Sequence, residues 1–188
     1  MQTRAGLIEA LARHQPFNEY EAKMLERVLE FVRAHDDCFE RTLAIGHVTG
    51  SAWIVDAAHT HALLTHHAKL GLWLQPGGHC DGDSDVFRVA MREVEEEAGL
   101  KQLAPLLGAA IFDVDAHAIP ARKSEPAHVH YDVRYAFEAD RSLPLEISAE
   151  SRDLRWVPLD EVASLNTDES VMRMVSKTAL IGSSGRGR

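Results

Sequence analysis

Residues 92–100 read REVEEEAGL, and this stretch decides the fold. It carries four glutamates in five consecutive positions and then reaches Gly99. Just upstream, residues 76–79 read PGGH, a turn through which no strand can continue. From Val86 to Ala98, small apolar side chains recur at every fourth position. This spacing predicts one helix between the turn and Gly99.

The glutamates of this helix crowd one edge of its apolar face. At about 100° per residue, Glu93, Glu96 and Glu97 project beside the apolar residues instead of into open water. Like charges three or four residues apart repel, and partial burial disfavours a charged carboxylate. A divalent cation removes both penalties, and clustered carboxylate oxygens suit hard ions such as Mg²⁺ or Mn²⁺. The alternative is a solvated helix face, and the glycine turn favours the metal site.

The turn and the helix together resemble the Nudix box. The family pattern is Gly, five residues, Glu, seven residues, then Arg-Glu-apolar-x-Glu-Glu-x-Gly-apolar. Here the pattern runs from Gly78 to Leu100 with the required spacing. The positions that match are Gly78, Arg92, Glu93, Val94, Glu96, Glu97, Gly99 and Leu100. A pattern of this length is far more specific than a lone glycine motif.

One position departs from the family pattern. Its first glutamate, which in the family typically braces the motif arginine, is Ser84 here. We therefore expect Arg92 to find another partner, such as Asp83 or Asp85. Ser84 or Asp83 would also suit the N-cap of the helix.

The resemblance implies a fold and an activity. The fold is α/β, a Nudix-type α/β/α sandwich with a mixed central β-sheet and an N-terminal helical extension. We expect residues 1–40 to form that extension, packed on the main domain, residues 41–180 to form the Nudix domain, and residues 181–188 to form a disordered tail. The implied activity is a hydrolase that requires Mg²⁺ or Mn²⁺ and cleaves the pyrophosphate bond of a nucleoside diphosphate linked to another group.

The resemblance also implies the residues of the site. The expected metal ligands are Glu93, Glu96, Glu97 and the carbonyl of Gly77. Arg92 is expected to orient the glutamates. Glu96 or Glu97 is the first candidate for the general base, and Glu125 and His130 follow.

A second polar cluster follows the box. His128, His130 and Asp132 alternate, so on a strand they share one face. This pattern is typical of an exposed sheet face. It also suits a substrate pocket, because histidine titrates near neutral pH and can bind phosphate. The expected substrate-binding residues are His79, Glu125, His128 and His130. A zinc site made by His128, His130 and Asp132 is a further alternative.

Composition limits the class of protein. The 188 residues suffice for one domain with a sizeable core. A net charge of −9 disfavours a nonspecific nucleic-acid binder but allows a small nucleotide-derived substrate, and no DNA-binding domain is evident. Cys38 and Cys80 form no CxxC motif, and there is no long apolar run or signal peptide. We therefore expect a cytoplasmic protein without a membrane segment, and leave a homodimer open.

Periodicity predicts the remaining elements. Helices are expected at residues 7–12, 20–34 and 168–178, with Asn18 and a residue among 166–168 as caps. Strands are expected at residues 44–56, 62–66, 109–114, 129–139 and 153–159.

Two other functions stay open at this stage. The Ser84 departure motivates a Nudix-like module that binds nucleotides without catalysis. A diphosphate isomerase is the third alternative, since the isopentenyl diphosphate isomerases share this scaffold. That chemistry needs a cysteine near the diphosphate, and Cys80 follows the glycine turn.

Overall fold

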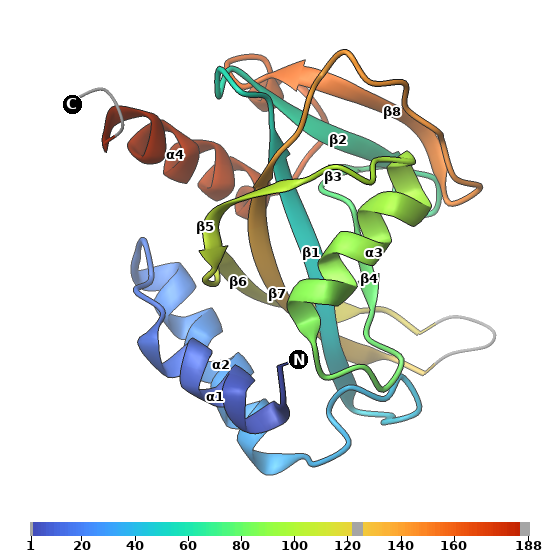
Figure 1. Ribbon diagram of the computed structural model, residues 1–188. Helices are drawn as coiled ribbons and strands as arrows, with labels where there is room; N and C mark the ends of the chain where they lie inside the picture. Colours follow the sequence, from blue (N-terminus) through green and yellow to red (C-terminus); the bar gives the residue numbers. More distant parts are fainter. Residues whose placement is uncertain (1, 122–125, 185–188) are drawn as a thin grey trace. The chain divides into compact units, whose positions relative to one another are not determined.

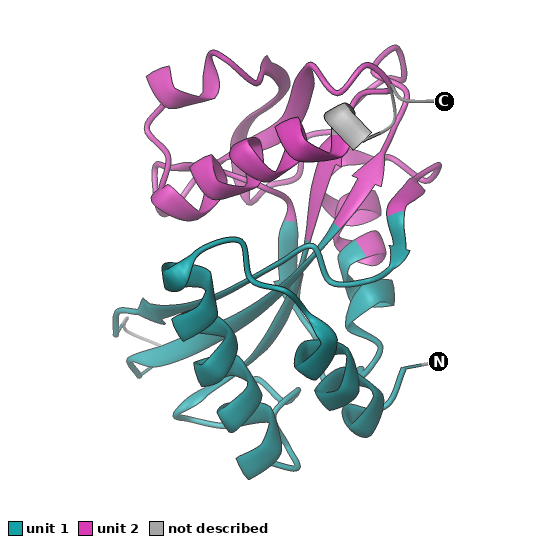
Figure 2. Cartoon of the chain, turned by 90° about the vertical axis from the view of Figure 1, so that its left-hand side faces the viewer, with its two compact units in different colours: residues 1–51, 77–90, 107–135 teal, residues 52–76, 91–106, 136–188 magenta. Residues whose placement is uncertain are grey.

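The computed structural model describes residues 2–121 and 126–184. The chain divides into two compact units (Figure 2). Unit 1 comprises residues 1–51, 77–90 and 107–135, and unit 2 comprises residues 52–76, 91–106 and 136–188. Boundaries between the units fall inside β1 (Gly46–Val55), α3 (Val86–Ala98), β5 (Ala104–Ala109) and β7 (His128–Glu138), so each of these elements gives residues to both units.

Two helices open unit 1 (Figure 1). α1 (Arg4–Arg13) and α2 (Glu19–Ala34) pack on each other. Asn18 caps α2 by accepting a hydrogen bond from the backbone N–H of Glu21 at 2.9 Å, which confirms the predicted cap. α2 also contacts β6 (Asp113–Ile119), and its Phe31 stacks on Tyr131 of β7 with the ring centroids 3.8 Å apart. α2 therefore packs on the β6–β7 pair, and α1 packs on α2.

Three strand contacts build the sheet of unit 1. β6 pairs antiparallel with β7 along its whole length, so that His117 lies opposite His130 and Asp115 opposite Asp132. β4 (Gly77–His79) pairs antiparallel with β1, which places His79 opposite Thr49. β1 in turn neighbours β7. These contacts place β1, β4, β6 and β7 in one sheet.

Two glycines allow the strands of unit 1 to approach closely. Gly46 has a φ of +150°, and a Cβ atom there would lie 2.4 Å from the carbonyl oxygen of Val129 on β7. A Cβ atom at Gly77 would lie 2.2 Å from Oγ of Ser51 on β1. Both contacts are therefore compatible only with glycine.

Unit 2 is centred on β2 (His61–His67). β2 pairs antiparallel with β1, with β3 (Trp73–Leu74) and with β8 (Ser151–Pro158). β5 (Ala104–Ala109) pairs antiparallel with β7. The backbone of β7 bonds to that of β1 in each unit: Val129 donates to Ile45 in unit 1, and Ala139 donates to Val55 in unit 2. The partners advance together along the chain, so β1 and β7 run parallel and the sheet is mixed.

A short 3₁₀ helix, η1 (Val162–Ser164), and α4 (Glu169–Ser184) complete unit 2. Asp168 caps α4 by accepting a hydrogen bond from the backbone N–H of Val171 at 3.0 Å, which confirms it among the predicted caps. Trp53 of β1 donates its indole N–H to the hydroxyl of Thr178 on α4 at 2.8 Å. This buried bond fixes α4 to the sheet of its unit.

Two predicted elements differ from the structure. The strand predicted at residues 109–114 is wrong, because β5 ends at Ala109 and β6 begins at Asp113. Gly108, with a φ of +59°, turns the backbone there. α4 continues to Ser184, so residues 181–184, expected in a disordered tail, are helical. Residues 185–188 lie outside the described residues.

Within residues 2–121 and 126–184, no helix has both the length and the apolar character needed to cross a membrane.

Candidate functional site

The predicted box helix forms as α3, from Val86 to Ala98. Its apolar stripe is buried as expected, since Val86, Ala90, Val94 and Ala98 are all fully shielded from solvent. The helix ends at Gly99, which adopts a φ of +71°, a conformation that favours glycine. The predicted helix and its end are therefore confirmed.

The start of α3 differs from the prediction in its N-cap. The helix begins at Val86, and the carboxylate of Asp85 accepts the backbone N–H of Arg88 at 3.4 Å, so Asp85 takes the N-cap position. Asp83 accepts the backbone N–H of Asp85 at 2.9 Å. Ser84 instead donates its hydroxyl to the carbonyl of Gln2 at 2.9 Å. Ser84, which stands at the position of the family glutamate, is thus hydrogen-bonded to the N-terminal segment.

The box glutamates project from the part of α3 that belongs to unit 2. Glu93 is buried, Glu97 is half-buried and Glu96 is exposed. Nη2 of Arg92 lies 2.7 Å from Oε1 of Glu93, and its Nε lies 3.6 Å from Oε1 of Glu96. A buried carboxylate needs a positive partner, and Arg92 supplies one to Glu93. The expected role of Arg92 in orienting the glutamates stays a prediction.

Two neighbouring acids have different partners. Glu95 is exposed and pairs with Lys101 at 3.2 Å. Asp83 pairs with Arg88, with 2.7 Å between Oδ2 and Nη2. A contact of Arg92 with Asp83 or Asp85 stays a prediction.

The turn expected at residues 76–79 is wrong for its last three residues, which form strand β4 in unit 1 and pair with β1. Gly77 lies opposite Ser51 of β1, and His79 opposite Thr49. Cys80, which follows, forms no disulfide and has 1% of its surface exposed. Burial of this sulfur disfavours the isomerase alternative, because that chemistry needs a cysteine open to the diphosphate.

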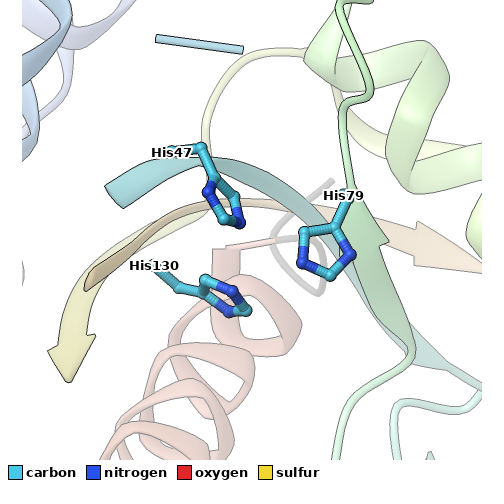
Figure 3. A group of neighbouring side chains, drawn as sticks. All are labelled: His47, His79 and His130. Carbon is cyan, nitrogen blue, oxygen red and sulfur yellow. The ribbon is translucent and has the colours of Figure 1, made fainter. Parts of the chain in front are cut away.

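A histidine cluster lies in unit 1, on the sheet face that carries His79. His47 of β1, His79 of β4 and His130 of β7 each direct a ring nitrogen into a common space, and these three atoms lie within 4.8 Å of one another (Figure 3). Nε2 of His128 lies 3.2 Å from Nε2 of His130. The ring of exposed His117 lies 5.6 Å from that of His130.

The structure therefore brings together three of the four predicted substrate-binding residues: His79, His128 and His130. The fourth, Glu125, lies outside the described residues. Sequence reasoning missed His47. The sequence pattern that could have indicated His47 is the alternation of His47, Thr49 and Ser51, which places all three on one face of β1. This pattern points to a site only once the pairing of β1 with β4 and β7 is known.

Burial controls the charge of this cluster. Desolvation lowers the pKa of His47 to about 4, and repulsion from neighbouring histidines adds to the effect. Desolvation and the same neighbours lower the pKa of His130 to about 2. Both imidazoles are neutral at pH 7, so each keeps a lone pair on one nitrogen. Neutral rings suit metal coordination better than they suit the attraction of phosphate.

Asp132 lies further along the same face of β7, and its side chain is neither exposed to solvent nor available to bind a metal ion. Asp132 is buried, and one of its oxygens accepts the hydroxyls of Thr49 at 2.9 Å and Ser51 at 2.8 Å. Its other oxygen accepts Nε of Arg134 at 2.7 Å. The expected exposed sheet face is thus wrong for this part of β7. Asp132 is engaged with protein donors, which disfavours the zinc site predicted at His128, His130 and Asp132.

The family follows from these features and from comparison with known proteins. Residues 47–177 match the model of the NUDIX domain, and the chain belongs to this family. Among curated proteins, none matches this sequence significantly.

Solved structures agree on the fold. An Ap4A hydrolase of C. elegans is 17% identical, with a TM-score of 0.57 over 73% of this chain and 98% of that one. A NUDIX family hydrolase of Clostridium perfringens is 24% identical, with a TM-score of 0.54 over 72% and 97%. The E. coli dihydroneopterin triphosphate pyrophosphohydrolase is 13% identical, with a TM-score of 0.55 over 69% and 92%. At these identities the likeness shows the mixed α/β Nudix fold alone.

Proposed function

We propose that this protein is a pyrophosphohydrolase that requires Mg²⁺ or Mn²⁺ and cleaves a nucleoside diphosphate linked to another group. The observation that carries the proposal is the box helix. It keeps Arg92, Glu93, Glu96 and Glu97 in the family register, and Arg92 contacts two of the glutamates within α3. The different substrates named for the structural neighbours are consistent with a shared reaction class and leave the particular substrate to experiment.

The donor set fits a hard divalent cation. Carboxylate oxygens are the protein ligands that Mg²⁺ and Mn²⁺ prefer. Three carboxylates within five residues, one of them buried, carry more negative charge than Arg92 alone can balance. In the proposal Glu93, Glu96 and Glu97 bind the ion, and the Gly77 carbonyl is the ligand that the family resemblance adds. When bound, the ion neutralises phosphate charge and acidifies a coordinated water.

Arg92 and the glutamates have different roles in the proposed reaction. Arg92 holds Glu93 and Glu96 in place, which avoids reorganisation during the reaction. Glu97, half-buried at the edge of the apolar face, is the first candidate to accept a proton from the attacking water, with Glu96 as the alternative.

A phosphate-release assay tests the proposal. A panel of nucleoside diphosphate derivatives is incubated with the enzyme and Mg²⁺ or Mn²⁺, and a phosphatase liberates phosphate from the products. Glu97→Gln should lower kcat by at least about 100-fold, the usual scale for a lost general base. Glu95→Gln is the matched control, because it makes the same change on the same helix at an exposed residue paired with Lys101, and it should retain activity.

The outcome also distinguishes the hydrolase from the non-catalytic module motivated by Ser84. Turnover that Glu97→Gln removes and Glu95→Gln keeps would support the hydrolase. Tight binding of nucleotides without turnover of any compound would refute the hydrolase and favour the module.

A further inference from the structure

We propose that His47, His79 and His130 form a binding site for a transition-metal ion, with Zn²⁺ as the natural occupant. The three residues come from β1, β4 and β7 of unit 1, and their rings face one another in Figure 3. The site is separate in residues and chemistry from the box glutamates, and it stands apart from the hydrolase proposal.

Strand register explains why the three rings meet. Thr49 lies opposite His79 in the β1–β4 pair, and His47 is two residues earlier on the same face of β1. The hydroxyl of Thr49 also reaches Asp132 on β7. His130 is two residues before Asp132, so it extends from β7 on that same face. The pairing of the strands therefore places all three histidine side chains on the same face of the sheet.

The second, independent observation concerns His47. Only 3% of this residue is exposed, and among the described residues neither of its ring nitrogens has a hydrogen-bond partner. Burial of polar atoms without partners is costly, and such atoms are rare in folded proteins. One of these nitrogens belongs to the group within 4.8 Å, so an ion there would satisfy it. A histidine that served only as packing would leave this cost uncompensated.

The distances suit an ion the size of zinc. Zn–N bonds of about 2.1 Å in a tetrahedral arrangement place ligand nitrogens about 3.4 Å apart. The observed nitrogens lie within 4.8 Å, so an approach of at most about 1.4 Å closes the site, within the reach of rotations about the side-chain bonds. Imidazole donors favour Zn²⁺ over Mg²⁺, which prefers oxygen.

His128 lies next to the three ligands. Its Nδ1 is 2.9 Å from the carbonyl of Pro126, so this nitrogen carries the proton and donates. In the neutral form of this ring the lone pair is on Nε2, which lies 3.2 Å from Nε2 of His130. His128 is therefore placed as the fourth ligand or as an orienting neighbour, and three histidines with water in the fourth position are also sufficient for zinc.

The test is zinc binding to the purified full chain after treatment with a chelator. Titration against a chromophoric zinc indicator should show one tight site per chain. His79→Ala should weaken zinc binding by more than about 100-fold, beyond the 10–100-fold typical of a lost outer partner. His47→Asn should do the same. His79 is half-buried, so its variant keeps the test valid if the His47 variant fails to fold.

Two controls separate this site from others. His61→Ala removes a histidine from unit 2, and Glu97→Gln removes a box carboxylate, and both should keep zinc binding. Cobalt gives a second readout, because Co²⁺ bound in a four-coordinate site absorbs visible light strongly, and this band should vanish in His79→Ala.

Two results would overturn the proposal. One is zinc affinity that is unchanged in His79→Ala and His47→Asn, which would locate the metal elsewhere. The other is a chain without tight zinc binding that binds inorganic pyrophosphate through His79, which would assign the cluster to phosphate recognition.

Discussion

Replacing Arg134 by methionine should reduce the free energy of unfolding by about 3–5 kcal/mol. Arg134 is 2% exposed, and its guanidinium lies 2.7 Å from Asp132, 3.3 Å from Asp113 and 3.5 Å from Asp115. Burial opposes its charge, yet the three carboxylates raise the pKa of Arg134 above its usual value. Methionine retains much of the volume but leaves three buried acids without their shared cation.

The effect is large enough to measure by thermal and urea unfolding. For a protein of this size, 1 kcal/mol corresponds to about 2–4 °C in Tm, so a loss of about 6–20 °C is expected. Arg134→Lys is the control, because it keeps the positive charge and loses only the planar fork that reaches several carboxylates. Its Tm should fall between those of the wild type and Arg134→Met.

The reasoning fails if Arg134→Met changes the unfolding free energy by less than about 1 kcal/mol, the range of an exposed ion pair. Such a result would mean that water compensates the three carboxylates, and that β6 and β7 do not depend on this cation.

Three further predictions concern single contacts. Gly77→Ala should lower Tm because the new Cβ meets Oγ of Ser51, and adding Ser51→Gly should restore only part of the loss in the same thermal scan, since the backbone Cα of residue 51 would still lie 2.8 Å from that Cβ. Trp53→Phe should cost about 1–3 kcal/mol in urea unfolding, since it removes a buried hydrogen bond to Thr178 and leaves a gap. Burial opposes the charge of Asp56, but hydrogen bonds from two backbone N–H groups and a hydroxyl lower its pKa below 3.8. Its stabilisation is therefore present at pH values above 3.8 and is lost as the pH falls through the lowered pKa. Asp56→Asn should destabilise the protein at pH 7 and progressively less as the pH falls below 3.8, and a loss that does not change with pH would contradict the sign.

The box helix was predictable because its information is local. Positions 86, 90, 94 and 98 are one turn apart, so the apolar stripe and the edge of glutamates follow from helix geometry alone. Gly99 marks the end because the backbone there requires a positive φ. The N-cap was missed by one residue, since Asp83, Ser84 and Asp85 are all good caps and only the folded chain selects among them.

The prediction of a strand at residues 109–114 was wrong because it relied on a local apolar run. Its apolar run contains Ile111 and Phe112, which are buried, but burial alone does not distinguish a strand from the connection between two strands. Gly108, near the end of β5, has a positive φ, and the chain enters the next strand, β6, only at Asp113.

His47 could not be found by spacing, because its partners are 32 and 83 positions away in the chain. Their meeting depends on the β1–β4 register, which places His79 opposite Thr49, and on the contact of β1 with β7, in which Val129 donates to the carbonyl of Ile45. It also depends on Gly46, whose missing side chain lets β1 approach Val129. A one-residue slip in any of these strands would turn a histidine to the other face.

The two donor sets differ in how the fold assembles them, and this difference predicts how each ion acts on the protein. The glutamates are neighbours on one helix, so they stay together wherever α3 is intact, and binding by these three carboxylates alone adds little to the long-range order of the chain. The histidines are neighbours only when β1, β4 and β7 are paired, so an ion that binds all three stabilises those pairings by its own binding free energy. Zinc should therefore raise the stability of the sheet in unit 1, whereas magnesium should act mainly on phosphate chemistry.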